Sequence, residues 1–329
     1  MEARILGGTW LTVSPIGLGL AALGRPGYIN LGHAADLARD YELARMEAHA
    51  HAVLDAAWEA GVRYFDAARS YGRAEAFLAS WLAKRQIAPG AVSVGSKWGY
   101  TYTAGWKAEA ERHEVKDHSL STLLRQSAES REILGPYLGL YQIHSATPES
   151  GVLEDRAVLE ELARLRGQGW KIGLTVTGPR QGETVRRALG VTVGGERLFD
   201  CVQATWNLLE PSAGPALEET KAAGLGVIVK EALANGRLTA RNAAPAFAVR
   251  RQRLEEEATR FGASLDALAG VLARPWVDIV LSGVAAVDQL RSNLAALAVP
   301  WDHWASEMTE SLAESPEDYW HTRARLPWN

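Results

Sequence analysis

Short apolar runs alternate with longer segments of helical periodicity along nearly the whole chain. Eight of the apolar runs are predicted to be strands: Ile16–Leu20, Val62–Asp66, Val92–Lys97, Leu138–His144, Lys171–Val176, Phe199–Thr205, Gly226–Lys230 and Val277–Ser282. Eight further segments are predicted to be helices: Ala48–Ala60, Ala74–Lys84, Ser119–Leu134, Ala157–Gln168, Glu183–Leu189, Pro215–Ala223, Ser264–Ala273 and Val287–Leu297. Several strands are almost continuously apolar, as in a parallel sheet that is covered on both faces. The pattern therefore predicts a parallel α/β fold.

Eight strand–helix units fit a single (β/α)8 TIM barrel, which takes roughly 250 residues before insertions. The chain has 329 residues, which leaves length for long βα loops and a C-terminal extension. No linker or block of charge divides it, so we expect one domain over residues 1–329. A doubly wound sheet would alternate similarly, but Gly17-Leu18-Gly19 lacks the third glycine of a dinucleotide fingerprint, and a loop follows it.

Three segments exceed ordinary loop length, namely residues 22–45, residues 98–118 and the tail from Trp301. Two of them follow the carboxyl ends of strands, where barrels build their active sites. The aromatic residues in them predict an apolar substrate pocket, for which Tyr28, Trp98 and Trp106 are the candidates. The alternative is that these rings seal the barrel mouth or form a contact between subunits.

Composition and charge narrow the class of protein further. The chain is 47% hydrophobic and 22% charged, as in ordinary globular domains. A formal net charge of -4 and the lack of a basic run argue against nucleic acid or an anionic membrane as a partner. The single cysteine, Cys201, excludes an internal disulfide, and neither a signal peptide nor a long apolar run is found. We expect a cytoplasmic protein that acts on a small molecule; its oligomeric state has no sequence signature.

Four ionisable side chains lie at or just beyond the carboxyl ends of three consecutive predicted strands. They are Asp66, Tyr71, Lys97 and His144. Neighbouring strands lie about 4.8 Å apart, so the four groups can converge on one site. A phenol is a poor acid at neutral pH, but a nearby ammonium lowers its pKa, and a carboxylate can hold that ammonium in place. A neutral imidazole can orient a carbonyl oxygen. The set suits proton-coupled hydride transfer.

Each of these residues alone has an ordinary structural explanation, as a helix cap, a packed ring or a buried histidine. Their joint position on one face of one fold favours catalysis. A barrel hydrolase or lyase that uses Asp66 and His144 with a metal ion is a further possibility. However, His113, Glu114 and His118 in the nearby loop lack regular ligand spacing, and we expect no metal.

The motifs around these residues resemble those of the aldo-keto reductases. Tyr64-Phe65-Asp66-Ala67-Ala68-x-Ser70-Tyr71-Gly72, Ser96-Lys97 and Gln142-Ile143-His144 are similar to the three catalytic segments of that family. Arg4–Leu20 resembles its N-terminal β-hairpin and first strand. Further similar segments cover the fifth strand, the sixth strand and the last cofactor-binding loop and helix: Ile172–Thr175, Val202–Leu208, and Ser282-Gly283 with Gln289 and Asn293.

The resemblance implies a nicotinamide-dependent oxidoreductase that interconverts a carbonyl compound and its alcohol or sugar. Tyr71 would then be the general acid or base, Lys97 would lower its pKa, Asp66 would pair with Lys97, and His144 would orient the substrate oxygen. NADPH is the expected cofactor, with NADH as the alternative. The residues implied to bind it are Gly19, Asp66, Thr175, Gln203, Lys230, Leu233, Asn235, Gly236, Leu238, Ser282, Val284, Gln289 and Asn293.

The chain departs from the family pattern at three places. Val176 stands where the family usually has an asparagine that binds the carboxamide. Lys230 stands at the position of a ring-stacking tyrosine, and it could pair with Glu231 or reach the cofactor. Ala285 occupies a position that is often arginine in members preferring the 2′-phosphate, and Arg291 could replace that arginine. A catalytically weak, cofactor-sensing or regulatory barrel of the same fold is therefore the alternative function.

Overall fold

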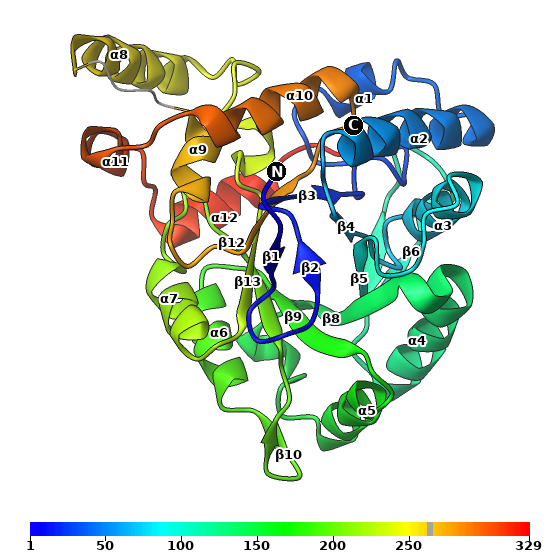
Figure 1. Ribbon diagram of the computed structural model, residues 1–329. Helices are drawn as coiled ribbons and strands as arrows, with labels where there is room; N and C mark the ends of the chain where they lie inside the picture. Colours follow the sequence, from blue (N-terminus) through cyan, green and yellow to red (C-terminus); the bar gives the residue numbers. More distant parts are fainter. Residues whose placement is uncertain (262–265) are drawn as a thin grey trace.

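Eight parallel strands close into a barrel in a computed structural model that describes residues 1–261 and 266–329 (Figure 1). The strands are β3 (Ile16–Gly19), β4 (Tyr64–Asp66), β5 (Ser93–Trp98), β8 (Leu138–Ala146), β9 (Lys171–Val176), β12 (Cys201–Thr205), β13 (Gly226–Lys230) and β14 (Ile279–Ser282). Each pairs with its neighbours in chain order, and β14 returns to β3. The predicted (β/α)8 TIM barrel is confirmed. β5 and β8 run further than expected, because Trp98 pairs with Ile143 and Ala146 with Val176.

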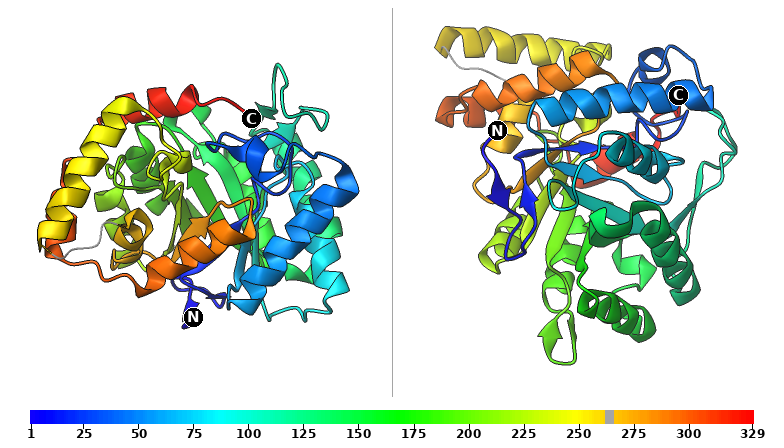
Figure 2. Two further views of the ribbon diagram at one scale, coloured as in Figure 1. Left: turned by 90° about the horizontal axis from the view of Figure 1, so that it is seen from above. Right: turned by 45° about the vertical axis from the view of Figure 1, so that its right-hand side comes forward.

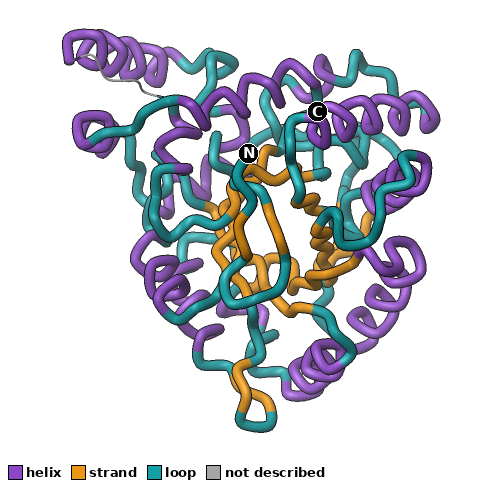
Figure 3. The backbone as a smooth tube through the Cα atoms, in the orientation of Figure 1, coloured by secondary structure: helices purple, strands orange, loops and turns teal. Residues whose placement is uncertain are grey.

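A ring of helices covers the outside of the barrel (Figure 3). It consists of α2 (Leu43–Glu59), α3 (Ala74–Lys84), α4 (Leu120–Leu134), α5 (Arg156–Gly167), α6 (Gln181–Leu189), α7 (Gly214–Ala222), α9 (Ala267–Leu272) and α10 (Val287–Ala295). α2 begins five residues before the predicted Ala48, because the side chain of Glu42 accepts the backbone N–H groups of Ala44 and Arg45. Ser264, where we expected another helix to begin, lies outside the described residues.

The N-terminal hairpin joins β1 (Arg4–Ile5) to β2 (Thr12–Val13) and lies across one opening of the barrel (Figure 1). Its residues Leu6, Leu11 and Val13 are fully buried together with strand residues such as Tyr64. A second, larger apolar cluster fills the space between the strands and the helices. The hairpin therefore closes the amino-terminal end, and the carboxyl ends of the strands form the opposite face.

The remaining elements are insertions and the C-terminal extension. Among the described residues they are the hairpins β6 (Tyr100–Tyr102) with β7 (Glu114–Lys116) and β10 (Thr192–Val193) with β11 (Glu196–Arg197), and the helices α1 (His33–Asp36), α8 (Pro245–Phe261), α11 (His303–Glu310) and α12 (Pro316–Ala324). Short 3-10 turns are found at Gly135–Tyr137, Pro148–Ser150, Ala234–Gly236 and Ala296–Ala298. α8 lies beside α11 at the periphery (Figure 2). Within the described residues, none of the helices combines the length and apolarity needed to cross a membrane.

The end of the chain crosses the carboxyl-terminal face of the barrel. The backbone N–H groups of Tyr28 and Asn329 each donate to the carbonyl oxygen of the other residue, at 3.1 Å. The side chain of Asn329 adds bonds to Ala34 and Asn30. These contacts hold the extension against the first long βα loop, so two segments far apart in sequence form one wall.

Candidate active site

A cavity of about 600 Å³ opens at the carboxyl ends of the strands. Its inner end lies between the ends of β4, β8 and β13, where Asp66, His144 and Lys230 contribute to its wall. Its outer end reaches the start of α10 and the segment of α1. The closure of the barrel brings the ends of these strands, which lie far apart in sequence, to one mouth.

Asp66 is the centre of a buried polar network beneath the cavity. Its Oδ1 atom accepts a hydrogen bond from the ammonium of Lys97, which also donates to the carbonyl oxygen of Ala67 at 2.8 Å. Its Oδ2 atom accepts from Tyr64 at 3.1 Å and from Gln203 at 3.0 Å. Asp66 and Lys97 are 2% and 1% exposed, so a full set of partners is needed to offset the cost of burying both charges. The network fixes the ammonium of Lys97 in one position.

Tyr71 and His144 meet above this network. The Tyr71 hydroxyl and His144 Nε2 are 3.5 Å apart, and the two rings lie edge to face. The ammonium of Lys97 lies 4.8 Å from the centroid of the Tyr71 ring. Tyr100 of β6 also packs against the imidazole, with ring centroids 4.9 Å apart. A proton donor and a second polar group therefore face the same point of the cavity.

The pKa shifts at this pair differ from one sequence expectation. Burial lowers the pKa of His144 well below its usual value, so the imidazole is neutral at physiological pH, as expected. The pKa of Tyr71 is raised well above its usual value by burial and by the negative charge of Asp66. The expectation that Lys97 lowers the Tyr71 pKa is thus not met in the free protein. The reason is that burial, the largest cause, and the carboxylate of Asp66 both disfavour the phenolate, and the outcome is a protonated phenol.

Arg25 is a site residue that the sequence analysis missed. Its guanidinium lies among three rings, at 5.1 Å from the centroid of Tyr28, 5.2 Å from that of Tyr71 and 4.8 Å from that of Trp328. It also donates to the carboxylate of Glu114 at 2.9 Å. No local motif could reveal this residue, because its partners come from the βα loops and the extreme C-terminus.

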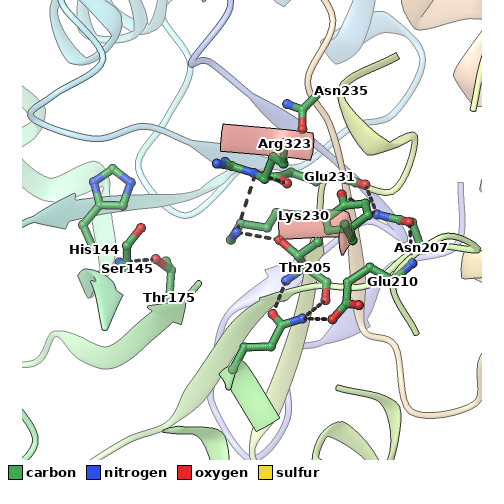
Figure 4. A network of polar contacts seen from close by, with 12 residues as sticks. His144, Ser145, Thr175, Thr205, Asn207, Glu210, Lys230, Glu231, Asn235 and Arg323 are labelled. Atoms are coloured by element: carbon green, nitrogen blue, oxygen red, sulfur yellow. Dashed lines mark hydrogen bonds and ion pairs between the residues drawn. The ribbon is translucent and has the colours of Figure 1, made fainter. Parts of the chain in front are cut away.

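Lys230, Glu231 and Arg323 form a charged cluster on the opposite side of the cavity mouth from His144 (Figure 4). Arg323 of α12 binds Glu231 in a bidentate pair, with Nε at 2.8 and 3.0 Å from the two carboxylate oxygens. Lys230 donates to Thr205 at 2.7 Å, and its amine lies 3.7 Å from Glu231. The sequence left open whether Lys230 pairs with Glu231; the principal partner of Glu231 is Arg323.

Most of the residues implied to bind a cofactor line this one cavity. They are Gly19, Asp66, Thr175, Gln203, Lys230, Leu233, Asn235, Gly236, Val284, Gln289 and Asn293. Ser282 and Leu238 do not line it: Ser282 accepts a hydrogen bond from Asn293 at 3.0 Å, and Leu238 borders a separate cavity beside α8. In the part of the chain that the structure describes, Oδ1 of Asn235 and Nδ1 of His144 are buried polar atoms of cavity-lining residues that have no hydrogen-bonding partner. The cavity size and these free polar atoms fit a dinucleotide.

The aromatic candidates for the substrate pocket separate into two groups. Tyr28 lines the cavity, and so does Trp328 from the C-terminal extension, one of the long segments whose aromatic residues predicted the pocket. Trp98 and Trp106 do not line it. Trp98 is fully buried against His118, and Trp106 donates its indole N–H to the Tyr41 carbonyl at 2.7 Å. These two rings support the loop walls from behind.

The outer end of the cavity carries more acid than base. Arg241 forms a bidentate pair with Asp36, both bonds at 2.6 Å, and Asp288 is a second carboxylate in the wall. Arg291, which the sequence offered as a phosphate ligand, is exposed and does not line the cavity. A 2′-phosphate at this end would therefore meet two carboxylates and an arginine that is already paired.

No group of three or more His, Cys, Asp or Glu side chains is arranged to hold a metal ion in residues 1–261 and 266–329. The loop residues considered for that role have other partners. His113 bonds to the Ala108 carbonyl, Glu114 accepts from Arg25, and His118 bonds to the His144 carbonyl.

The structure is a (β/α)8 barrel with a tyrosine, a histidine and a lysine–aspartate pair near the carboxyl ends of its strands. Residues 15–314 match the model of the Aldo/keto reductase family, and the chain belongs to that family. It is 27% identical to "Pyridoxal 4-dehydrogenase" from Microbacterium luteolum, over 94% of this chain and 98% of the relative. It is 25% identical to the uncharacterized oxidoreductase YqkF of Bacillus subtilis (strain 168), over 90% of this chain and 91% of the relative.

Solved structures of aldo-keto reductases also align with this chain. A putative aldo-keto reductase from Pseudomonas aeruginosa, PA4992, aligns with a TM-score of 0.63 and 25% identity, over 90% of this chain and 94% of that chain. The holo form of the aldo-keto reductase AKR11C1 from Bacillus halodurans aligns with a TM-score of 0.71 over 96% of this chain and 97% of that chain. Its identity of 20% bears on the fold alone.

Proposed function

We propose that the chain is a nicotinamide-dependent oxidoreductase that interconverts a carbonyl compound and its alcohol, with Tyr71 as the proton donor in reduction. The observation that carries the proposal is the 3.5 Å approach of the Tyr71 hydroxyl to Nε2 of His144 at the inner end of the cavity. A carbonyl oxygen placed between these two groups would receive hydrogen bonds from both. The bound dihydronicotinamide would supply the hydride.

The protonation states of the free protein suit the reductive direction. The raised pKa of Tyr71 keeps its proton on the phenol until the substrate oxygen gains negative charge. His144, whose pKa is lowered, is neutral and can donate one N–H to that oxygen. The ammonium of Lys97 lies beside the tyrosine ring, where its positive charge would stabilise the phenolate that remains after proton transfer.

Replacing Tyr71 by phenylalanine tests the assignment. Tyr71→Phe should lower kcat by about 10²–10⁴-fold, because only the transferable proton is removed. The dissociation constant of NADPH should stay within about twofold, since the ring and its packing remain. The assay follows NADPH absorbance with 4-nitrobenzaldehyde as substrate. Tyr137→Phe is the matched control, because Tyr137 donates to the Ile87 carbonyl and lies outside the cavity. Unchanged turnover in Tyr71→Phe would show that the proton comes from another group.

The same assay distinguishes an enzyme from a cofactor-sensing barrel. If the wild-type protein binds NADPH and NADP⁺ but neither consumes NADPH with aldehydes and ketones nor produces it from NADP⁺ with alcohols, the regulatory alternative is correct. The panel should include pyridoxal with NAD⁺ and NADP⁺, because one relative is named for oxidising it. Oxidation of pyridoxal or of an alcohol, with little carbonyl reduction, would identify the chain as a dehydrogenase.

The choice between NADPH and NADH depends on the outer end of the cavity. The sequence analysis favoured NADPH, but the excess of acid formed by Asp36 and Asp288 over Arg241 favours NADH. We propose that both dinucleotides bind and that the 2′-phosphate brings little affinity. Dissociation constants for the two reduced cofactors, measured at low and at high ionic strength, test this; a strong, salt-sensitive preference for NADPH would refute it.

A further inference from the structure

Lys230 is a surplus positive charge at the inner end of the cavity. Each of the other three cations there donates directly to a carboxylate: Lys97 to Asp66, Arg25 to Glu114, and Arg323 to Glu231. Four cations and three carboxylates leave a net charge of +1 among these described residues. Lys230 donates to the neutral hydroxyl of Thr205, and the nearest carboxylate oxygen lies 3.7 Å away, already bonded to Arg323.

This ammonium acts on the same buried compartment as the reacting groups. The positive charge of Lys230 is one of the causes that lower the pKa of His144, and that of Lys97 is one of the causes that lower the pKa of Lys230. Figure 4 shows Lys230 beside Thr205 and the Glu231–Arg323 pair, with His144 across the mouth of the barrel. Desolvation, opposed by Glu231 and reinforced by Arg323 and Lys97, lowers the pKa of Lys230 to about 8.

We propose that Lys230 weakens the binding of the oxidised cofactor relative to the reduced one. Its ammonium repels the cationic oxidised nicotinamide ring and does not repel the uncharged reduced ring. The inference rests on the proposed function. Hydride transfer requires the ring to touch the carbon whose oxygen lies beside Tyr71 and His144, so the ring must occupy the compartment that Lys230 faces. Reduction adds a hydride, one proton with two electrons, and removes the positive charge of the ring. Like-charge repulsion therefore acts on one redox form only.

The consequence is a bound cofactor that accepts hydride more readily than the free one. Weak binding of the oxidised form and tight binding of the reduced form shift the bound couple toward reduction, which favours oxidation of an alcohol substrate. The effect depends on pH, because the charge of Lys230 is present below about pH 8 and is lost above it. The pKa of His144 lies well below this window and that of Tyr71 lies well above it.

The experiment measures binding without any substrate. Dissociation constants for NADP⁺ and NADPH are determined by quenching of tryptophan fluorescence between pH 6.5 and 9.5. The ratio of the NADP⁺ constant to the NADPH constant is then compared between pH values and between variants. Phosphates are common to both forms, so their contribution cancels. In the wild-type protein the ratio should fall at least tenfold as the pH rises through 8. In Lys230→Met it should be at least tenfold lower at pH 6.5 and independent of pH.

Two further variants sharpen the test. Lys230→Arg keeps a charge that does not titrate in this range, so the high ratio should persist up to pH 9.5. Lys171→Met is the matched control, because Lys171 begins β9 at the other end of the barrel and does not line the cavity. It should behave as the wild type does at every pH.

The outcomes separate this inference from the proposed function. If neither redox form binds the wild-type protein, the proposed function itself fails. If both bind but the ratio is flat with pH and unchanged in Lys230→Met, the role of Lys230 is refuted. A variant whose only defect is a higher KM for the carbonyl compound would show that Lys230 binds substrate instead, which also refutes it. If Lys230→Met does not fold, the pH dependence of the ratio of dissociation constants in the wild-type protein tests the proposal without it.

Discussion

Removing Arg323 should destabilise the whole barrel, because it leaves Glu231 buried without its main partner. Glu231 has a side chain only 7% exposed, and Arg323 reaches it from α12. Arg323 and Lys230 outweigh the effect of burial and lower the pKa of Glu231 from 4.5 to about 2. At about 1.36 kcal/mol per pKa unit, this shift corresponds to roughly 3 kcal/mol of stability. Breaking a buried pair costs about 3–5 kcal/mol. Since Lys230 remains 3.7 Å away, we expect about 3 kcal/mol for Arg323→Met.

The pH dependence follows from the direction of the shift. The folded-state pKa of Glu231 lies below the unfolded value, so its stabilisation is complete above about pH 4.5 and is lost as the pH falls toward 2. Of this roughly 3 kcal/mol, about 2 kcal/mol remains at pH 3.5. The difference in unfolding free energy between wild type and Arg323→Met should therefore shrink between pH 5 and pH 3.5.

Urea unfolding followed by the fluorescence of the 12 tryptophans measures this difference. With a slope of about 3 kcal/mol per molar urea, the midpoint of Arg323→Met should lie about 1 M below that of the wild type at pH 7. Arg186→Met is the control, because Arg186 binds Glu219 with the same bidentate geometry on the surface, where such pairs contribute about 0–1 kcal/mol. A loss under 1 kcal/mol for Arg323→Met, or a difference that stays constant down to pH 3.5, would refute the reasoning.

Three other variants test the geometry of the cavity. Asp36→Asn should raise the affinity for NADPH relative to NADH by about tenfold, because it removes a carboxylate from the outer end; equal changes in both dissociation constants would count against this. Gly95→Ala would place its Cβ 2.3 Å from the Tyr64 hydroxyl and should cost about 1–3 kcal/mol in urea unfolding, and an unchanged midpoint would contradict it. Trp328→Ala should raise KM for aromatic aldehydes several-fold more than for short aliphatic ones, whereas Trp106→Ala should not. If only Trp106→Ala had this effect, the assignment of the substrate pocket to the cavity that Trp328 lines would be refuted.

The sequence by itself determined the barrel and the ionisable residues at or near the carboxyl ends of three of its strands. Continuous apolar runs such as Gly226–Lys230 are typical of strands in a parallel sheet that is covered on both faces. Eight strand–helix units in succession then leave few folds other than a (β/α)8 barrel. Because parallel strands end at one face, Asp66, Lys97 and His144 could be assigned to a common site without coordinates. Local motifs also identified Tyr71, since the turn after the second barrel strand fixes its position relative to Asp66.

Only the tertiary structure decided which charges meet and which aromatic rings line the cavity. Arg25 and Glu114 are 89 residues apart, and Glu231 and Arg323 are 92 apart, so no spacing rule connects them. The direction of the Tyr71 pKa also depended on the fold, because burial and a neighbouring carboxylate act through distance and not through sequence. Periodicity determines which face of an element is buried. The long loops and the C-terminal extension have no periodicity, and their positions follow from contacts that form only when the barrel has closed.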